Sequence, residues 1–511
     1  MSVKPTFTVE AYLSGVWTNI TADVDQASGF RIKYGIDANG PLDGMADPGE
    51  FSCALQNSAK ASTSRPLGYY SPLHASVRSG WTWGVPMRVT LIDPTGGASY
   101  VKHRGKARVI DPMPGKYLER RVAVVSSDAM ADLDEADVRS LSIQTDQTES
   151  QLIAAVLDSL PVDSQPITRN IDTGIDIIPY AFHDLGDGVK ASGLINDIAV
   201  DSYALVFVKG DGTFTVRNRH TRVAGSSVLT LTDATERDFA SPSSLDQAFN
   251  QVRVTIHPVT IDDTPTTVLY ADQTVRSIGA GQTVEFWVSY SDPSAGQVTL
   301  IGGLNVVTAP VAGTDYAGNA QADGLGSDLT ANITIAVTPF GSAALVSVTN
   351  SAGVQAFLVD AAGDPFLHIR GQGVYDLGPQ TYEASSVQPY GTRPLSVDLR
   401  YQDSPATAQD YAEFLEAQRN SLADQPQMVA FCANNSAALM TQALTREPGD
   451  IITVSETMTG FTSVDAVIQS VELELVSGSI LFCRWGLAPT APFSMWTLDV
   501  STFDSQTVLG F

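Results

Sequence analysis

Alternating apolar and polar residues recur along most of this 511-residue chain, and this period of two constrains its fold more than any other feature. In the stretch VELELVSGSILFCRW, two glutamates separate Val471, Leu473 and Leu475, and a Ser-Gly pair follows. Because successive side chains of a β-strand point to opposite faces, the pattern predicts a hairpin with one buried face. A chain with many such segments is expected to be mainly β, and its length predicts about three or four domains.

Residues 1–128 are predicted to form the first domain. Met87–Ile92 is rich in β-formers, and the turn DPTGG leads into a second run at residues 99–110. A further short strand is predicted at residues 122–125. Few helix signals interrupt these strands, which is typical of a β-barrel or a β-sandwich.

Residues 129–245 are predicted to form an α+β domain. In TESQLIAAVLDSLP, Thr148 and Gln151 form a capping box ahead of an apolar helical face, and Pro161 ends the helix. A second helix is predicted over residues 190–202. It leads into ALVFVKGDGTFTVRNR, where Gly-Asp-Gly provides a hairpin turn.

Residues 263–373 have a purely β texture, as in VEFWVSY and ITIAV. About 110 residues of this kind match one immunoglobulin-like sandwich, so we predict an inserted domain of that class. The flanking segments 246–262 and 374–490 are predicted to form one discontinuous β domain with an associated helix, whose N-cap is Ser404. Residues 491–511 are predicted to form an apolar tail.

The charge balance is strongly acidic, with a net charge of −26. Such a field repels nucleic acid and anionic membrane surfaces, so stable binding to nucleic acid is not expected. The amino terminus lacks the apolar core of a signal peptide and no run of 18 apolar residues occurs, so we expect cytoplasmic synthesis without membrane insertion. Cys53, Cys432 and Cys483 lie far apart in strand-like runs and are interpreted as buried apolar residues.

No catalytic motif appears in the sequence. The six histidines are scattered, and Gly-x-Ser-x-Gly, His-Glu-x-x-His and phosphate-binding glycine loops do not occur. We therefore expect no catalytic, cofactor-binding or metal-binding residues and no enzymatic activity. Carboxylate pairs such as Glu472 with Glu474 would suit a glycosidase, but such pairs arise freely in an acidic chain.

The segment GYYSPLHASVRSGWTWGVPMRV is the strongest candidate for an interaction site. It gathers four aromatic residues near arginines, a combination typical of protein–protein contacts. A loop that packs over its own domain explains the cluster equally well. The candidate contact residues are Tyr69, Tyr70, Trp81 and Trp83, together with Arg393, whose guanidinium precedes a proline turn and is suited to a carboxylate or a row of carbonyls.

Several stretches together resemble the tail hub proteins of tailed bacteriophages, also called baseplate hub or minor tail proteins. The pattern begins in GEFSCALQNSAKASTSRPLGYYSPLHASVRSGWTWGVPMRVTL, and the residues that carry it are Leu55, Asn57, Ser58, Tyr70, Ser71, Pro72, Gly84, Pro86, Arg88 and Val89. The stretches GDGTFTVRNR, FNQVRVTIHP, SVQPYGTRPLSVDL and REPGDIITV follow in the order found in these hubs. The resemblance covers about 350 residues and leaves the insertion and the tail unexplained.

The resemblance implies a homotrimeric virion protein at the tail tip, assembled in the host cytoplasm. Each chain would contribute two β-barrels related to those of the tail tube, so that three chains adapt six-fold to three-fold symmetry and give passage to DNA. The implied partners are the tail tube end or a distal tail protein, the tape measure protein, and a tail fibre or spike. No cofactor is implied.

Two other functions remain open. A receptor-binding tail adhesin would use the inserted sandwich to bind host surface glycan. A cell-wall hydrolase is less favoured, because no peptidoglycan-cleaving domain is recognisable in the sequence.

Overall fold

The computed structural model describes residues 3–495 and 507–508 except for short internal segments, namely 38–41, 59–63, 114–119, 139–140, 176, 183–184, 186–188, 224, 242–244, 246–247, 292–298, 421–425, 477–478 and 491–493. The described part is mainly β, as predicted. None of its helices is long and apolar enough to cross a membrane. The predicted apolar tail falls mostly outside the described residues; within it only two short strands are described, β34 (Ser494–Met495) and β35 (Thr507–Val508).

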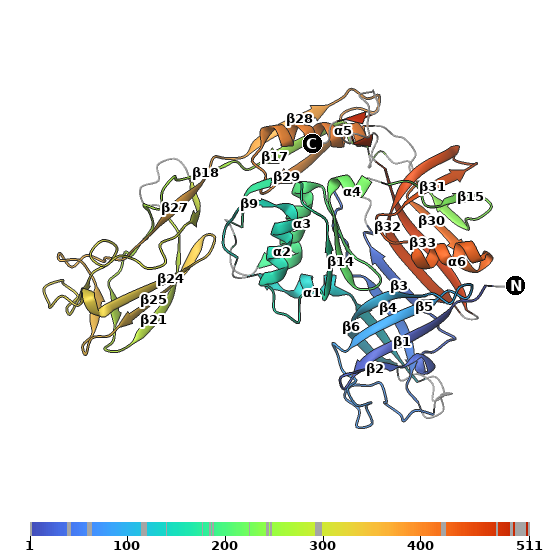
Figure 1. The fold of residues 1–511 in the computed structure, drawn as a ribbon, viewed down its shortest axis with the longest axis horizontal. Coiled ribbons are helices and arrows are strands. Elements are labelled where there is room, and N and C mark those ends of the chain that lie inside the picture. The colour runs from blue at the N-terminus through green and yellow to red at the C-terminus, as the bar shows by residue number, and fades with distance from the viewer. Residues whose placement is uncertain are drawn as a thin grey trace.

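A 13-stranded sheet joins strands from the amino-terminal and the carboxy-terminal parts of the chain (Figure 1). Its path runs β2-β1-β5-β6-β7-β4-β3 and continues directly into β32-β33-β30-β16, while β31 pairs with β32 and β15. The amino-terminal strands are β1 (Thr6–Leu13), β2 (Val16–Asn19), β3 (Phe30–Gly35), β4 (Glu50–Gln56), β5 (Pro86–Ile92), β6 (Ser99–Met113) and β7 (Arg121–Ser127). The others are β15 (Thr230–Thr232), β16 (Asp238–Ala240), β30 (Met428–Cys432), β31 (Ile451–Glu456), β32 (Phe461–Val476) and β33 (Ile480–Pro489).

The described strands do not form the two expected β-barrels as closed barrels. Among the described strands, the path is open and ends at β2 and β16. Strand β3 pairs with β32, from Phe30 opposite Leu475 to Gly35 opposite Ser470. Because this pairing occupies the edge of the amino-terminal strand group, that group continues into the carboxy-terminal one instead of closing on itself. The two groups share one hydrophobic core.

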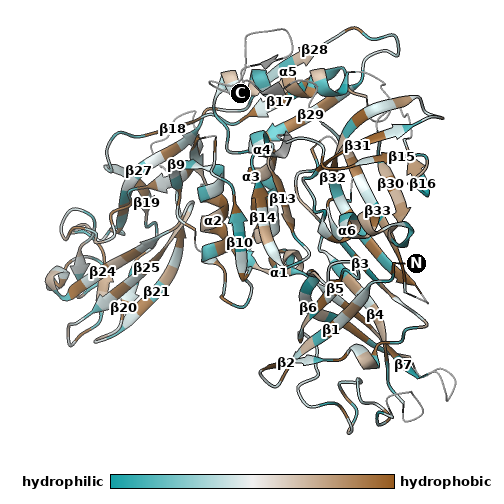
Figure 2. Ribbon diagram, turned by 45° about the vertical axis from the view of Figure 1, so that its right-hand side comes forward, coloured by the Kyte–Doolittle hydropathy of each residue, from teal (hydrophilic) through white to brown (hydrophobic). Residues whose placement is uncertain are grey.

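Alternation explains how the sheet buries one face. Strand β33 alternates buried and more exposed positions, with Leu481, Cys483 and Trp485 buried. Strand β5 does the same, and Figure 2 shows the alternation as changes of colour along the strands. Helix α6 (Ala437–Thr445) adds Leu439, Met440, Ala443 and Leu444 to the same core.

The middle region forms a second core, around two helices. Helix α2 (Glu149–Ser159) begins at the predicted capping box, where the Thr148 amide donates to Gln151 Oε1 at 2.8 Å. Helix α3 (Ala191–Ser202) and the hairpin of β13 (Leu205–Val208) and β14 (Thr213–Arg217) also form where the sequence predicts them. The remaining elements are α1 (Ala129–Glu135), β8 (Asp137–Val138), β9 (Gln144–Thr148), β10 (Thr168–Ile171), β11 (Ile177–Ala181), β12 (Val189–Lys190) and α4 (Arg219–Val223).

A separate layer connects the middle region to the insertion. Strand β17 (Gln251–Ile256) pairs with β28 (Gln380–Ser385) and β29 (Pro394–Leu399), and helix α5 (Pro405–Arg419) packs on this sheet. These strands were expected in the second barrel, but they form a sheet of their own. The predicted N-cap is confirmed, because Ser404 Oγ accepts from the Thr407 amide.

The described residues between 259 and 376 form a module with its own core, called the inserted module below, which lies at the left of Figure 1. Three small sheets, β18-β27-β19 with β22, β20-β26-β23 and β21-β25-β24, surround its own hydrophobic core. The immunoglobulin-like class stays a prediction. The strands are β18 (Val259–Ile261), β19 (Thr267–Ala271), β20 (Arg276–Ile278), β21 (Thr283–Ser289), β22 (Thr299–Leu304), β23 (Gly318–Asn319), β24 (Ile333–Pro339), β25 (Ala343–Asn350), β26 (Ala356–Leu358) and β27 (His368–Asp376).

Candidate interaction surface

The aromatic loop, residues 64–85 between β4 and β5, is held in place by buried side chains. Asn57, just after β4, accepts the Tyr70 amide at 2.8 Å and donates to Ser71 Oγ at 2.9 Å. The Trp81 indole nitrogen donates to the Tyr70 carbonyl at 2.9 Å, and the two rings meet edge to face at 5.0 Å. These contacts close the loop onto the end of the amino-terminal strands.

A buried carboxylate organises the same loop. The Tyr70 hydroxyl donates to Asp23 at 2.5 Å, and Arg65 Nε donates to the other oxygen of Asp23 at 2.8 Å. Arg78 in turn donates to the Tyr70 hydroxyl at 2.7 Å. Burial, followed by the bond to Asp23, raises the pKa of Tyr70 well above its ordinary value, so the hydroxyl stays a donor at physiological pH.

The loop divides the four aromatic candidates into two pairs. Tyr70 and Trp81 are buried inside the chain, so their rings are not available to a partner in this structure. For these two residues the loop packed over its own domain is the better interpretation. Tyr69 is half-buried beneath the guanidinium groups of Arg65 and Arg78, whereas 48% of Trp83 is exposed. Trp83 remains the stronger contact candidate.

Arg393, the fifth candidate, makes contacts within its own chain. Its amide donates to Asn250 Oδ1 at 2.7 Å, and its Nε donates to the Ala248 carbonyl at 3.2 Å. The side chain thus binds a carbonyl, one of the two kinds of acceptor expected for it. These bonds fasten the turn before β29 to the start of β17, which gives Arg393 a local structural role.

A buried lysine, not anticipated from the sequence, joins three parts of the chain. Lys102 on β6 is 1% exposed; its Nζ lies 2.7 Å from Glu447 Oε1 and 3.0 Å from the Tyr34 hydroxyl. The Gly210 amide of the middle hairpin lies 3.5 Å from the second oxygen of Glu447. Burial and the adjacent Glu447 raise the pKa of Tyr34 well above its ordinary value.

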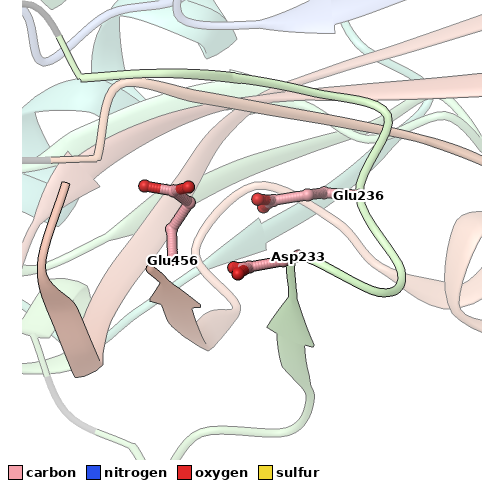
Figure 3. Close-up of side chains that lie close together, drawn as sticks. All are labelled: Asp233, Glu236 and Glu456. Carbon is pink, nitrogen blue, oxygen red and sulfur yellow. The ribbon is translucent and has the colours of Figure 1, made fainter. Parts of the chain in front are cut away.

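Three carboxylates meet near the β15 end of the large sheet: Asp233 and Glu236 from the connection between β15 and β16, and Glu456 from the end of β31 (Figure 3). Asp233 accepts from the Thr457 amide at 3.1 Å and from the Thr457 hydroxyl, and Glu456 accepts from the Thr459 amide at 2.6 Å. Glu236 completes the group, and its partial burial raises its pKa. Since Asp233 and Glu456 already fasten the β31–β32 turn, the cluster has a structural explanation and carries no metal assignment.

A histidine and a serine meet inside the amino-terminal sheet. His103 Nε2 lies 2.9 Å from Ser126 Oγ, a spacing that a nucleophile and its base would also have. Both residues are buried, however, and desolvation lowers the pKa of His103 to about 3, so the ring is neutral at physiological pH. With no access for a substrate, this pair is a component of the core.

No protein-family model matches the chain, and no curated protein matches it in sequence. Solved structures do match over nearly the whole length. The tail protein from Neisseria meningitidis MC58 has a TM-score of 0.51 and 9% identity, with 95% of this chain and 96% of that chain covered. The 43 kDa tail protein of prophage MuSo2 from Shewanella oneidensis has a TM-score of 0.48 and 10% identity, with 96% and 97% covered. Prophage tail protein gp18 from Listeria monocytogenes EGD-e has a TM-score of 0.41 and 8% identity, with 94% of each chain covered. At 9% identity, the match to the Neisseria protein shows that this chain has the fold of a tail protein.

Proposed function

We propose that this chain is a structural protein of a bacteriophage tail and serves as its hub at the tip. The observation that carries the proposal is the fold shared with the Neisseria tail protein over 95% of the chain. A shared fold is compatible with many functions, so the assignment also needs support from the architecture.

The architecture supports a ring-forming role. The β3–β32 pairing places the amino-terminal and carboxy-terminal strand groups side by side in one chain. Three copies would then present six strand groups around an axis, as a hub that adapts six-fold to three-fold symmetry requires. Within the described residues, β2 and β16 leave the path open at both ends, where neighbouring copies can meet.

In this role the ring lies between the tail tube end, or a distal tail protein, and a fibre or spike, with the tape measure protein ending nearby. The net charge of −26 suits a passage through which DNA slides without binding. Trp83, exposed and adjacent to β5, is the residue assigned to a subunit or partner contact. The protein would accordingly be located in the virion, at the tail tip.

The test is the mass of the purified protein in solution, by light scattering, together with electron micrographs of the particles. We expect a mass three times the 54.2 kDa of one chain, and ring-shaped particles. If Trp83 lies in the subunit contact, Trp83→Glu weakens the trimer; Leu325→Glu, at a residue 79% exposed in the inserted module, leaves it intact. A monomer at all concentrations, with no three-fold particle, would overturn the hub.

A further inference from the structure

The outer face of the sheet β21-β25-β24 in the inserted module has an unusual composition. The opposite face supplies the core of the module through residues such as Val288, Val346 and Ile335. Outward-facing positions on the three strands are exposed or half-buried and are occupied by Thr283, Glu285, Trp287, Ser289, Thr334, Ala336, Thr338, Ala343, Leu345, Ser347 and Thr349.

An aromatic platform occupies one part of this face. Trp287 is 60% exposed, and its ring lies 5.0 Å from that of Phe340 at an interplanar angle of 33°. The register places Leu345 between Trp287 and Thr338 on the two neighbouring strands. An indole on a sheet surface with this much exposure offers a broad apolar face to a ligand.

Hydroxyl groups lie to one side of the platform: Ser347 stands between Glu285 and Ala336 in the next row, and the row beyond it holds three threonines. The hydroxyls of Thr283 and Thr349 lie 2.8 Å apart across β21 and β25, and Thr349 also faces Thr334. Ser347 stands between them and the platform. Hydroxyls donate and accept hydrogen bonds without adding charge, so the rows suit a ligand that itself carries many hydroxyl groups.

The face is nearly uncharged. Glu285 is the one charged residue among the outward-facing positions of these three fully described strands, in a chain of net charge −26. The centre of a protein interface usually carries several large apolar or arginine anchors, whereas here one aromatic platform has mainly small neighbours such as Ser289, Ala343 and Ser347. A sugar chain fits better, because its rings have an apolar C–H face and a rim of hydroxyls.

We propose that this face binds a neutral polysaccharide, with a sugar ring stacked on Trp287 and its hydroxyls bonded to the Ser and Thr rows. This function is additional to the hub and does not depend on it. It assigns the glycan-binding role considered for the insertion to one sheet and one central residue.

The test is electrophoresis of the full-length protein in native gels that contain dextran, mannan or, as an anionic comparison, polygalacturonate. We expect at least one neutral polysaccharide to retard the protein. Trp287→Ala is expected to weaken the apparent affinity about tenfold or more, and Trp287→Phe to lie between it and the original protein. Tyr12→Ala, which removes an exposed ring from the large sheet, is expected to leave the affinity unchanged.

Melting curves and the solution mass of each variant separate binding from folding and assembly. The proposal is overturned if neither dextran nor mannan retards the protein. It is also overturned if Trp287→Ala and the original protein are retarded equally. Retardation by polygalacturonate alone also contradicts it. A change of particle mass in Trp287→Ala without any loss of retardation would assign the face to a protein contact instead.

Discussion

Asp23 shows how a single buried carboxylate orders a long loop. It is fully buried, and the Tyr70 hydroxyl and Arg65 each bond to one of its oxygens. A buried charge is stable only when its hydrogen bonds are satisfied. Removing one donor therefore costs more free energy of folding than that hydrogen bond contributes on its own. The exposed Trp83 therefore projects from a loop whose base is rigidly defined.

Tyr70→Phe is expected to lower the free energy of unfolding by about 1–3 kcal/mol, because it leaves an oxygen of Asp23 without that donor. Tyr69→Phe is the matched control, since Tyr69 is half-buried and its ring, rather than its hydroxyl, contacts the neighbouring arginines; a change within about 0.5 kcal/mol is expected. Denaturant titration of both variants measures the difference. Equal effects would mean that the Tyr70 hydroxyl does not support the loop.

At the scale of elements, the pairing of β3 with β32 decides the architecture. It needs a close approach at Gly29, which precedes β3 and has φ of +67°. A Cβ at this position would lie 1.9 Å from the Leu475 carbonyl oxygen. Only glycine allows the two backbones to meet there.

Gly29→Ala is expected to destabilise the protein by at least about 3 kcal/mol, through the left-handed conformation and the backbone clash together. Gly97→Ala is the matched control, because Gly97 has φ of +70° but nothing within 4 Å of its added Cβ. It is expected to cost only about 1–2 kcal/mol. Thermal melting of both variants tests the comparison, and similar shifts would contradict the close approach.

At the scale of the whole molecule, Lys102 connects regions that are distant in sequence. The ion pair joins β6 to the segment between α6 and β31, and the middle hairpin approaches at Gly210. The two partners differ in exposure: the Lys102 side chain is 1% exposed and that of Glu447 is 23% exposed. The cost of breaking the pair should therefore depend on which partner is removed.

Glu447→Gln is expected to cost about 3 kcal/mol or more, because it leaves the lysine charge buried without a counter-ion. Lys102→Met should cost less, since it substitutes an apolar chain and leaves a carboxylate that reaches water. Glu383→Gln, in the exposed Arg253–Glu383 pair, is expected to leave the stability almost unchanged, because solvent screens that pair. Denaturant titration gives the unfolding free energy of all three variants. A larger loss for Lys102→Met than for Glu447→Gln would refute the assigned burial.

The sequence by itself determined the local elements, because their causes are local. Alternation predicted the strands, the Thr148–Gln151 box predicted the start of α2, and Ser404 predicted the start of α5. Each depends on neighbouring residues a few positions apart. The aromatic context also predicted Trp83 as a contact residue, and that role stays a prediction.

The tertiary structure alone decided how the elements combine and which side chains stay exposed. Strand periodicity does not specify a partner, so it could not show that β3 pairs with β32 or that β17 forms a separate sheet. Nor could local sequence separate buried Tyr70 from exposed Trp83, or bring Lys102 to Glu447 across 345 positions. Burial and pairing between distant segments are properties of the whole packed chain, and no short window of sequence contains them.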